Sequence, residues 1–154
     1  MRRDLQVVAA AVAGALLLTL NGAALAQTDS DASHQMYLDL LRRADSFVGK
    51  PLSFAGQVIE SIQSGQSSAL RINVTPGKYN SWRDTIYVEY KLTAAGQTQI
   101  AEGALVSVRG TFTGTKSYQS VIGDTITVPS VVACMIQPGV ENIAACPGEA
   151  PAKN

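Results

Sequence analysis

The sequence predicts a mainly β protein, a small barrel of five strands with an amphipathic helix before it. Five segments alternate apolar and polar residues with a period of two, which is the pattern of half-buried strands. Two of these segments contain an internal glycine, Gly56 and Gly110, and such a glycine marks a bend or bulge that lets a sheet curl. A longer connection, 92–103, separates the third segment from the fourth. Together these features indicate a closed or partly closed barrel.

The first 26 residues have the organisation of a secretory signal peptide. Arg2 and Arg3 give a basic start, 5–20 is almost wholly apolar, and a small-x-small cleavage site ends at Ala26. The apolar run is shorter than the roughly 20 residues that a bilayer-spanning helix needs. No cysteine follows the site to carry a lipid. We therefore expect a periplasmic or secreted protein that starts at Gln27 and has no transmembrane segment; the alternative is an uncleaved anchor.

The remaining chain has the length of one domain and almost no net charge. The leader holds two arginines and one aspartate of the chain's 12 basic and 12 acidic residues, so the mature charge is near −1. Such a balance provides no long-range field for a polyanion. Bulk nucleic-acid binding is therefore not expected.

The two cysteines, Cys134 and Cys146, predict a disulfide in an exported protein. There is no CxxC motif, and the one histidine, His34, is distant in sequence, so we expect neither a metal nor a cofactor. The predicted organisation is a signal peptide over 1–26, a flexible linker over 27–33, a barrel domain over 34–136, and a tail over 137–154 tied by the disulfide.

The segment His34–Phe47 carries apolar residues at three- and four-residue intervals, which is typical of an amphipathic helix. Ser33 is a candidate N-cap, and Gly49 is a candidate stop. Its polar positions hold both acids and bases, whereas a helix on a membrane surface needs a stronger cationic bias. We expect this helix to pack on the barrel.

The five predicted strands follow in order, and the first can continue to Ile62. They are Leu52–Val58, Leu70–Val74, Ile86–Tyr90, Val106–Phe112 and Thr125–Ile136. Pro129 interrupts the last of them, and because proline cannot donate to a β-ladder, this strand is expected to be an edge that is bulged or broken there. The simplest barrel with these features is the five-stranded Greek-key OB barrel.

A series of residues between about Tyr37 and Ile136 forms a recognisable pattern. It consists of Tyr37, Leu40, Phe47-Val48-Gly49-Lys50, Phe54-x-Gly56-x-Val58, Ile100-x-Glu102-Gly103-x-x-Val106-x-Val108-x-Gly110, Gly114, Tyr118, Gly123, Ile126, Pro129 and Ala133. This pattern resembles small exported bacterial OB-fold proteins, mostly of unknown function. Many such proteins have an acid after the Glu-Gly pair, where this chain has Ala104. The resemblance implies the fold and leaves the activity open.

An OB barrel binds ligands across strands two and three and the loops that flank them. The candidate ligand-binding residues are Arg71 and Asn73 on the second strand, Lys78, Tyr79, Trp82 and Arg83 in the following loop, Tyr87 on the third strand, and Lys116 and Tyr118 in the loop between strands four and five. Cations interleaved with aromatic rings could stack a base or a sugar. The alternative is structural, with Trp82 capping the barrel and Tyr118 supporting its loop.

No catalytic constellation stands out, since no two carboxylates are singled out as a pair and His34 lies near the terminus. The first hypothesis is a non-enzymatic binding module of the cell envelope for an oligosaccharide, oligonucleotide or peptide. It requires Tyr79, Trp82 and Tyr87 to be exposed on one concave surface. The second is a regulatory or interaction subunit that pairs an envelope protein with the edge near Pro129, with buried loop aromatics. A secreted OB-fold nuclease, which requires converging acids, is a third and less favoured alternative.

Overall fold

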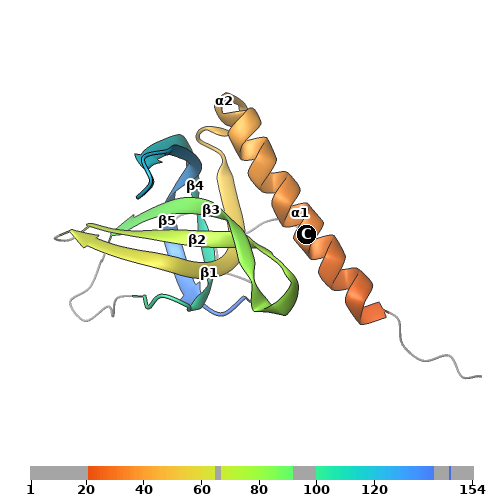
Figure 1. Cartoon of the computed structure of the whole chain (residues 1–154). Coiled ribbons are helices and arrows are strands. Elements are labelled where there is room, and N and C mark those ends of the chain that lie inside the picture. Colours follow the sequence, from red (N-terminus) through yellow and green to blue (C-terminus); the bar gives the residue numbers. More distant parts are fainter. Residues whose placement is uncertain (1–20, 65–66, 92–99, 141–145, 147–154) are drawn as a thin grey trace, which may run out of the picture.

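The computed structural model describes residues 21–64, 67–91, 100–140 and Cys146. Two helices precede five strands, with one short 3-10 turn between the second and third strands (Figure 1). The elements are α1 (Asn21–Arg42), α2 (Ala44–Phe47), β1 (Pro51–Ser64), β2 (Ser67–Pro76), η1 (Lys78–Asn80), β3 (Trp82–Lys91), β4 (Leu105–Gln119) and β5 (Thr125–Pro138).

The strands close into a barrel in the order β1-β2-β3-β5-β4. Neighbours are antiparallel except β3 and β5, which pair in parallel through Tyr87–Glu89 and Ser130–Val132. The ring closes because β1 is long enough to serve two partners, pairing with β4 through its first half and with β2 through its second. The prediction of a mainly β, five-stranded barrel is confirmed.

The two internal glycines lie where strands approach too closely for a side chain. A Cβ on Gly56 would lie 2.6 Å from Ile72 Cγ2 and still closer to the carbonyl oxygen of Asn73. A Cβ on Gly110 would lie 2.8 Å from the Cα of Ala133, at a register shift between β4 and β5. The expectation that these glycines let the sheet curl agrees with this geometry, because both contacts lie at the crossings that close the barrel.

The core fills the barrel from all five strands and from α1. Leu40 of α1 is 1% exposed and packs with the strand residues, while Met36 and Tyr37 are partly buried against them. The strand residues of this core are Val58, Leu70, Ile72, Val74, Ile86, Val88, Val106, Val108, Phe112 and Val131. Helix α1 therefore packs on the barrel through its apolar side.

The N-terminal helix is longer than the sequence predicts. Residues 27–33, expected to be a flexible linker with Ser33 as the helix cap, lie inside α1. The predicted helix also divides at Arg43, whose ψ of 38° is non-helical, so Ala44–Phe47 forms the separate α2. The linker was expected from the polar, acidic composition of 28–33, whereas the structure places this stretch in α1, where the hydroxyl of Ser30 donates to the carbonyl oxygen of Pro76.

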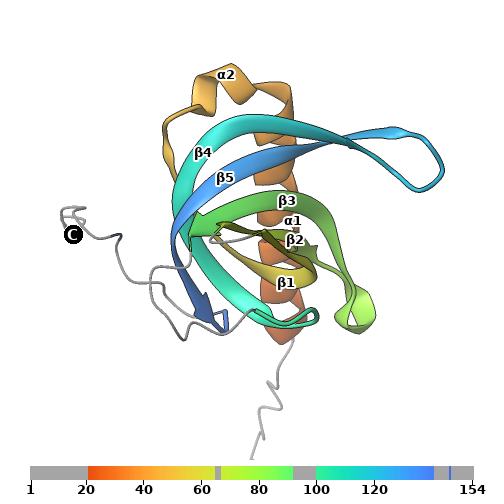
Figure 2. The same ribbon diagram turned by 90° about the vertical axis from the view of Figure 1, so that its left-hand side faces the viewer.

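The fourth and fifth strands also extend further than expected. Strand β4 continues to Gln119, so Lys116 and Tyr118 lie on a strand and not in a loop, and the turn is 120–124. Strand β5 runs unbroken through Pro129, which pairs with Thr115, and the nearby register shift lies on β4, between Phe112 and Gly114. We call residues 113–129 the arm; Figure 2 shows this two-stranded ribbon, coloured teal to blue, projecting beyond the barrel.

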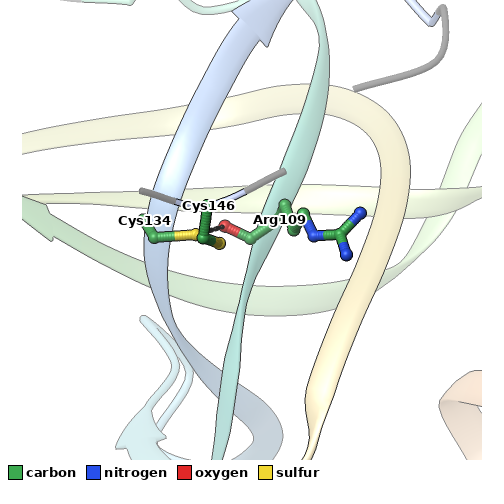
Figure 3. Close-up of a disulfide and its surroundings, with 3 residues drawn as sticks. All are labelled: Arg109, Cys134 and Cys146. Carbon is green, nitrogen blue, oxygen red and sulfur yellow. Dashed lines mark hydrogen bonds between the residues drawn. A yellow bond between two sulfur atoms is a disulfide. The ribbon is translucent and has the colours of Figure 1, made fainter. Parts of the chain in front are cut away.

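The predicted disulfide joins Cys134 on β5 to Cys146, with 5.6 Å between the two Cα atoms (Figure 3). This separation is within the ordinary range for disulfides. The Sγ of Cys134 lies 3.2 Å from the carbonyl oxygen of Arg109 on β4. The bond therefore fastens a point of the C-terminal tail against the β4–β5 pair. No helix among the residues that the structure describes is long and apolar enough to cross a bilayer.

Gly110→Ala is expected to lower the free energy of unfolding by about 1–3 kcal/mol, because the added methyl group meets backbone atoms that cannot rotate away. Urea unfolding of the purified protein measures this change. Thr111→Ala, at the exposed neighbouring position, is the control and should leave the free energy nearly unchanged. An equal loss of unfolding free energy in both variants would show that the methyl group added at Gly110 causes no steric clash.

Candidate functional site

The candidate site lies on the outer surface of β2 and β3, beside the arm. On β2, Leu70 and Ile72 point into the core, so Arg71 between them points outward. Tyr87 of β3 is paired in register with Arg71. Lys116 and Tyr118 of the arm contact these two residues. Residues from separate parts of the chain thus meet on one surface.

Arg71 is fixed between an aromatic ring and a carboxylate. Its guanidinium carbon lies 3.9 Å from the centroid of the Tyr118 ring, a cation–π distance. Its Nη1 lies 2.6 Å from Oε2 of Glu60 on β1, and 25% of the Arg71 side chain is exposed. Its Nε is buried and has no hydrogen-bond partner among the described residues. The contact between Arg71 and Tyr118 holds the arm to the barrel at one point.

Lys116 makes a similar but more exposed arrangement with Tyr87. Its Nζ lies 3.9 Å from the centroid of the Tyr87 ring and donates to Oε1 of Glu89 over 3.0 Å. The hydrogen bonds to Glu89 and Tyr87 raise the pKa of Lys116 above its ordinary value. Both Lys116 and Glu89 are nearly half exposed. Exposed ion pairs contribute little stability, so Lys116 can leave the Tyr87 ring at small cost.

We call these six residues the cation–aromatic face. They are Glu60, Arg71, Tyr87, Glu89, Lys116 and Tyr118. Two cations and two acids balance each other on it. The four cationic and aromatic members were all candidates from the sequence. The two acids were not, because the register that brings them beside the cations depends on the closed barrel.

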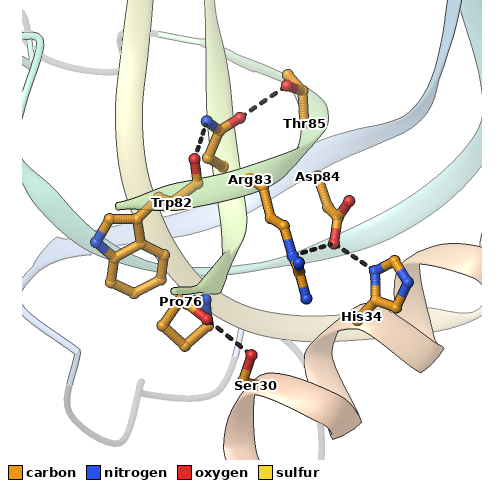
Figure 4. Close-up of polar contacts among 8 residues, drawn as sticks. Ser30, His34, Pro76, Trp82, Arg83, Asp84 and Thr85 are labelled. Atoms are coloured by element: carbon orange, nitrogen blue, oxygen red, sulfur yellow. Dashed lines mark hydrogen bonds and ion pairs between the residues drawn. The ribbon is translucent and has the colours of Figure 1, made fainter. Parts of the chain in front are cut away.

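Asn73, another candidate, uses its amide within the protein. Its Nδ2 donates to the carbonyl oxygen of Trp82 over 2.9 Å, and its Oδ1 accepts from the hydroxyl of Thr85 over 2.7 Å (Figure 4). These bonds cross between β2 and β3 where the hairpin leaves the barrel. Asn73 therefore fixes the base of this hairpin.

The predicted binding loop is the β2–β3 hairpin, and its tip is a tight turn. Tyr79 and Asn80 both have positive φ, 58° and 57°, as the two central residues of a type I′ turn require. The hydroxyl of Ser81 donates to the carbonyl oxygen of Lys78 over 2.7 Å and closes the turn. Positive φ is uncommon for a bulky residue, yet Tyr79 is fully exposed and gains no packing there.

The base of the same hairpin is clasped by α1 (Figure 4). Nδ1 of His34 lies 2.6 Å from Oδ2 of Asp84, and the hydroxyl of Ser30 donates to the carbonyl oxygen of Pro76 over 2.7 Å. Arg83 is a looser partner, with its Nε 3.8 Å from the same Asp84 oxygen. The sequence analysis did not find this contact. The signal for it was the spacing of four between Ser30 and His34, which places both on one side of a helix.

Tyr37 of α1 interacts electrostatically with Asp84 of the β2–β3 hairpin and with Tyr118 of the arm. Burial raises the pKa of its phenol above the ordinary value, and the negative charges of Asp84 and of ionised Tyr118 raise it further. The residue contacts the core from α1. A charge on Tyr37 would thus be unfavourable in the folded protein.

The structure divides the predicted site residues into two groups. Arg71, Tyr87, Lys116 and Tyr118 meet on the cation–aromatic face. The loop residues Lys78, Tyr79, Trp82 and Arg83 belong to the hairpin that α1 clasps, with Tyr79 fully exposed and Trp82 partly buried. In the described part of the chain, no group of three or more His, Cys, Asp or Glu residues could hold a metal ion.

No family model matches the chain, and no curated protein sequence matches it. Solved structures that it resembles include an aspartyl-tRNA synthetase from Leishmania major, at 15% identity and a TM-score of 0.45, over 69% of this chain and 20% of that one. A small single-stranded DNA-binding protein from Streptomyces coelicolor is 19% identical, with a TM-score of 0.40, over 59% and 94%. The mitochondrial single-stranded DNA-binding protein Rim1 from S. cerevisiae is 18% identical, with a TM-score of 0.36, over 61% and 98%. The chain spans only about a fifth of the synthetase.

Tyr37→Phe is expected to weaken the pH dependence of stability at alkaline pH. The unfolded chain releases the Tyr37 proton near pH 10, about the ordinary value, while the folded protein keeps it to higher pH. The free energy of unfolding of the wild type should therefore fall as the pH rises above about 10, and part of this fall should vanish in the variant. Urea unfolding between about pH 8 and pH 11 measures it.

Tyr79→Phe is the matched control, because it removes a phenol that is fully exposed. It should keep the alkaline slope of the wild type. The raised pKa of Lys116 acts in the same direction in all three proteins. An unchanged slope in Tyr37→Phe would contradict the placement of Tyr37.

Proposed function

We propose that this chain is an exported, non-enzymatic binding module of the cell envelope, built on an OB-type Greek-key barrel, and that its cation–aromatic face binds an uncharged oligosaccharide. The observation that carries the proposal is the meeting of Arg71 and Tyr87 with Lys116 and Tyr118, each cation 3.9 Å from a ring. This is the surface where an OB barrel binds its ligands.

The charge balance of the face favours a neutral ligand over a polyanion. Arg71 is paired with Glu60, and Lys116 with Glu89, so each cation faces an acid. A phosphate chain would meet both carboxylates and gain little from the cations. A sugar ring needs an aromatic surface and hydrogen-bonding groups, and the face supplies tyrosine rings beside charged donors and acceptors. Of the three ligand classes, an oligosaccharide fits these groups best.

The two halves of the face have different parts in this proposal. Arg71 and Tyr118 form the fixed half, because Arg71 is three-quarters buried and held by Glu60. Lys116 and Tyr87 form the adaptable half, because the ammonium group is exposed and can swing away from the ring. A sugar can then stack on Tyr87 in place of Lys116, while Lys116 donates to a sugar hydroxyl.

The test is calorimetric titration of neutral and acidic oligosaccharides, with a single-stranded oligothymidylate for comparison. We expect neutral oligosaccharides to bind and Tyr87→Ala to weaken the binding about 10-fold or more, since stacking on one ring is worth about 1–3 kcal/mol for a nucleobase and a similar contact is available to a pyranose. Val48→Thr, at an exposed position between α2 and β1, is the control. Tight binding of the oligonucleotide with a steep salt dependence, or unchanged affinity in Tyr87→Ala, would refute the proposal.

A second candidate function is pairing with an envelope protein through the edge of the arm. Strand β3 pairs with β5 only at Ser130–Val132, so the residues Thr125–Pro129 are paired with β4 alone. An extended segment of a partner can add to such an edge by main-chain hydrogen bonds. The full exposure of Tyr79 does not fit the version of this hypothesis in which the loop aromatics are buried.

Hydrogen exchange on the complex captured from an envelope fraction separates the two candidates. Edge pairing predicts that backbone amides of 125–129 become protected and that Thr125→Lys with Thr127→Lys abolishes capture, because lysines on an edge oppose pairing. Tyr87→Ala should leave this capture intact. Capture that depends on Tyr87 but not on the two threonines would instead favour the cation–aromatic face.

A further inference from the structure

The tip of the arm exposes two large aliphatic side chains. Val121 and Ile122 lie in the turn that joins β4 to β5, and they are 106% and 82% exposed. The turn itself is well formed, since the amide of Ser120 donates to the carbonyl oxygen of Asp124 over 2.8 Å and the amide of Asp124 donates to Oγ of Ser120 over 3.1 Å. The exposure therefore belongs to an ordered turn whose apolar side chains are almost wholly open to solvent.

The tip of the β2–β3 hairpin exposes a third apolar side chain. Tyr79 is 100% exposed and has positive φ, so the turn holds a ring outward at some conformational cost. Lys78 beside it is exposed, and 60% of the Arg83 side chain is exposed at the base of the hairpin. In Figure 2 both hairpins, green for β2–β3 and blue for β4–β5, extend to the right of the barrel, and Figure 1 shows that they lie apart, with the arm at the upper left and the β2–β3 hairpin at the lower right.

From these observations we infer that the two hairpin tips dock the protein on the surface of a phospholipid bilayer that contains anionic lipids. The apolar side chains of Val121 and Ile122 enter the boundary of the acyl chains, and Tyr79 lies at the level of the headgroups. Lys78 and Arg83 contact lipid phosphates. Aromatic and aliphatic side chains next to cations are the composition of interfacial anchors. This surface is separate from the cation–aromatic face.

The shape of the tips favours a bilayer over a protein partner. A protein interface needs a continuous patch with a buried apolar centre. Here the apolar groups lie at two separate hairpin tips. Between the tip of the arm and the barrel, the outward side chains include the uncharged polar residues Ser117 and Thr127, whose hydroxyl oxygens lie 2.8 Å apart. A soft lipid surface accepts separate apices at once, whereas a folded partner would need two matched pockets. One acid, Asp124, adjoins the arm tip, so the cations of the other hairpin carry the preference for anionic lipid.

The experiment is cosedimentation of the purified mature protein with vesicles of phosphatidylcholine, alone and mixed with phosphatidylglycerol. We expect binding to the mixed vesicles that salt weakens but does not abolish. Val121→Ser with Ile122→Ser should lower the partition coefficient about 10-fold or more, because two aliphatic side chains leave the apolar phase. Tyr79→Asn should lower it about 3-fold, and asparagine tolerates the positive φ, so the turn is kept.

Val132→Thr is the control, because it removes an exposed aliphatic group from the barrel wall and should leave partition unchanged. A second measurement uses Ile122→Trp in a Trp82→Phe background, where the emission of the new indole should shift to the blue on vesicles and be quenched by brominated lipids. Absence of vesicle binding, or equal binding by the serine variant, would overturn the inference. Self-association that the serine variant abolishes, in the absence of vesicle binding, would assign the tips to a second copy of the chain instead.

Discussion

The barrel depends on two crossings where neighbouring backbones touch with no room for a side chain. At Gly56 strand β1 passes from its pairing with β4 to its pairing with β2, and at Gly110 strand β4 shifts register against β5. Close approach there lets five strands close a ring, and closure gives β3 and β5 their parallel contact. Because β3 pairs with β5 only at Ser130–Val132, the part of the β4–β5 pair beyond this contact, residues 113–129, leaves the ring as the arm. The candidate site is a consequence of this geometry.

The arm is a two-stranded ribbon, and such a ribbon is marginally stable by itself. Its position is set by the contacts of its inner side chains with the barrel, with Tyr118 over Arg71 and Lys116 over Tyr87. The same four residues would meet a ligand. Holding the arm and binding a ligand are therefore not independent, and the looser of the two contacts, at Lys116, is the one that a ligand can replace without releasing the arm.

The sequence predicts the barrel well because burial on one side of a strand imposes a period of two on the residues themselves. It also predicts Arg71 and Tyr87 as face residues, because outward positions on β2 and β3 follow from that period. Lys116 and Tyr118 were candidates in an expected loop, which the structure shows to be part of β4. The sequence does not predict that Glu60 and Glu89 neutralise the cations, since this depends on register between strands. Nor does it predict the clasp of His34 and Asp84, which are 50 residues apart in the chain. Polar contacts of this kind leave no periodic pattern.

The contacts of Ser30 and His34 with the base of the β2–β3 hairpin make this hairpin more rigid than the arm. The β2–β3 hairpin is fixed at its base from both sides, by Asn73 within the sheet and by Ser30 and His34 of α1. The arm is fixed along its inner face by two cation–aromatic pairs, one with the mostly buried Arg71 and one with the half-exposed Lys116, and the second is weak. One hairpin is thus a rigid projection and the other an adjustable one. A rigid projection can set the orientation of the barrel at a surface, while an adjustable arm beside the cation–aromatic face can adapt to what that face holds.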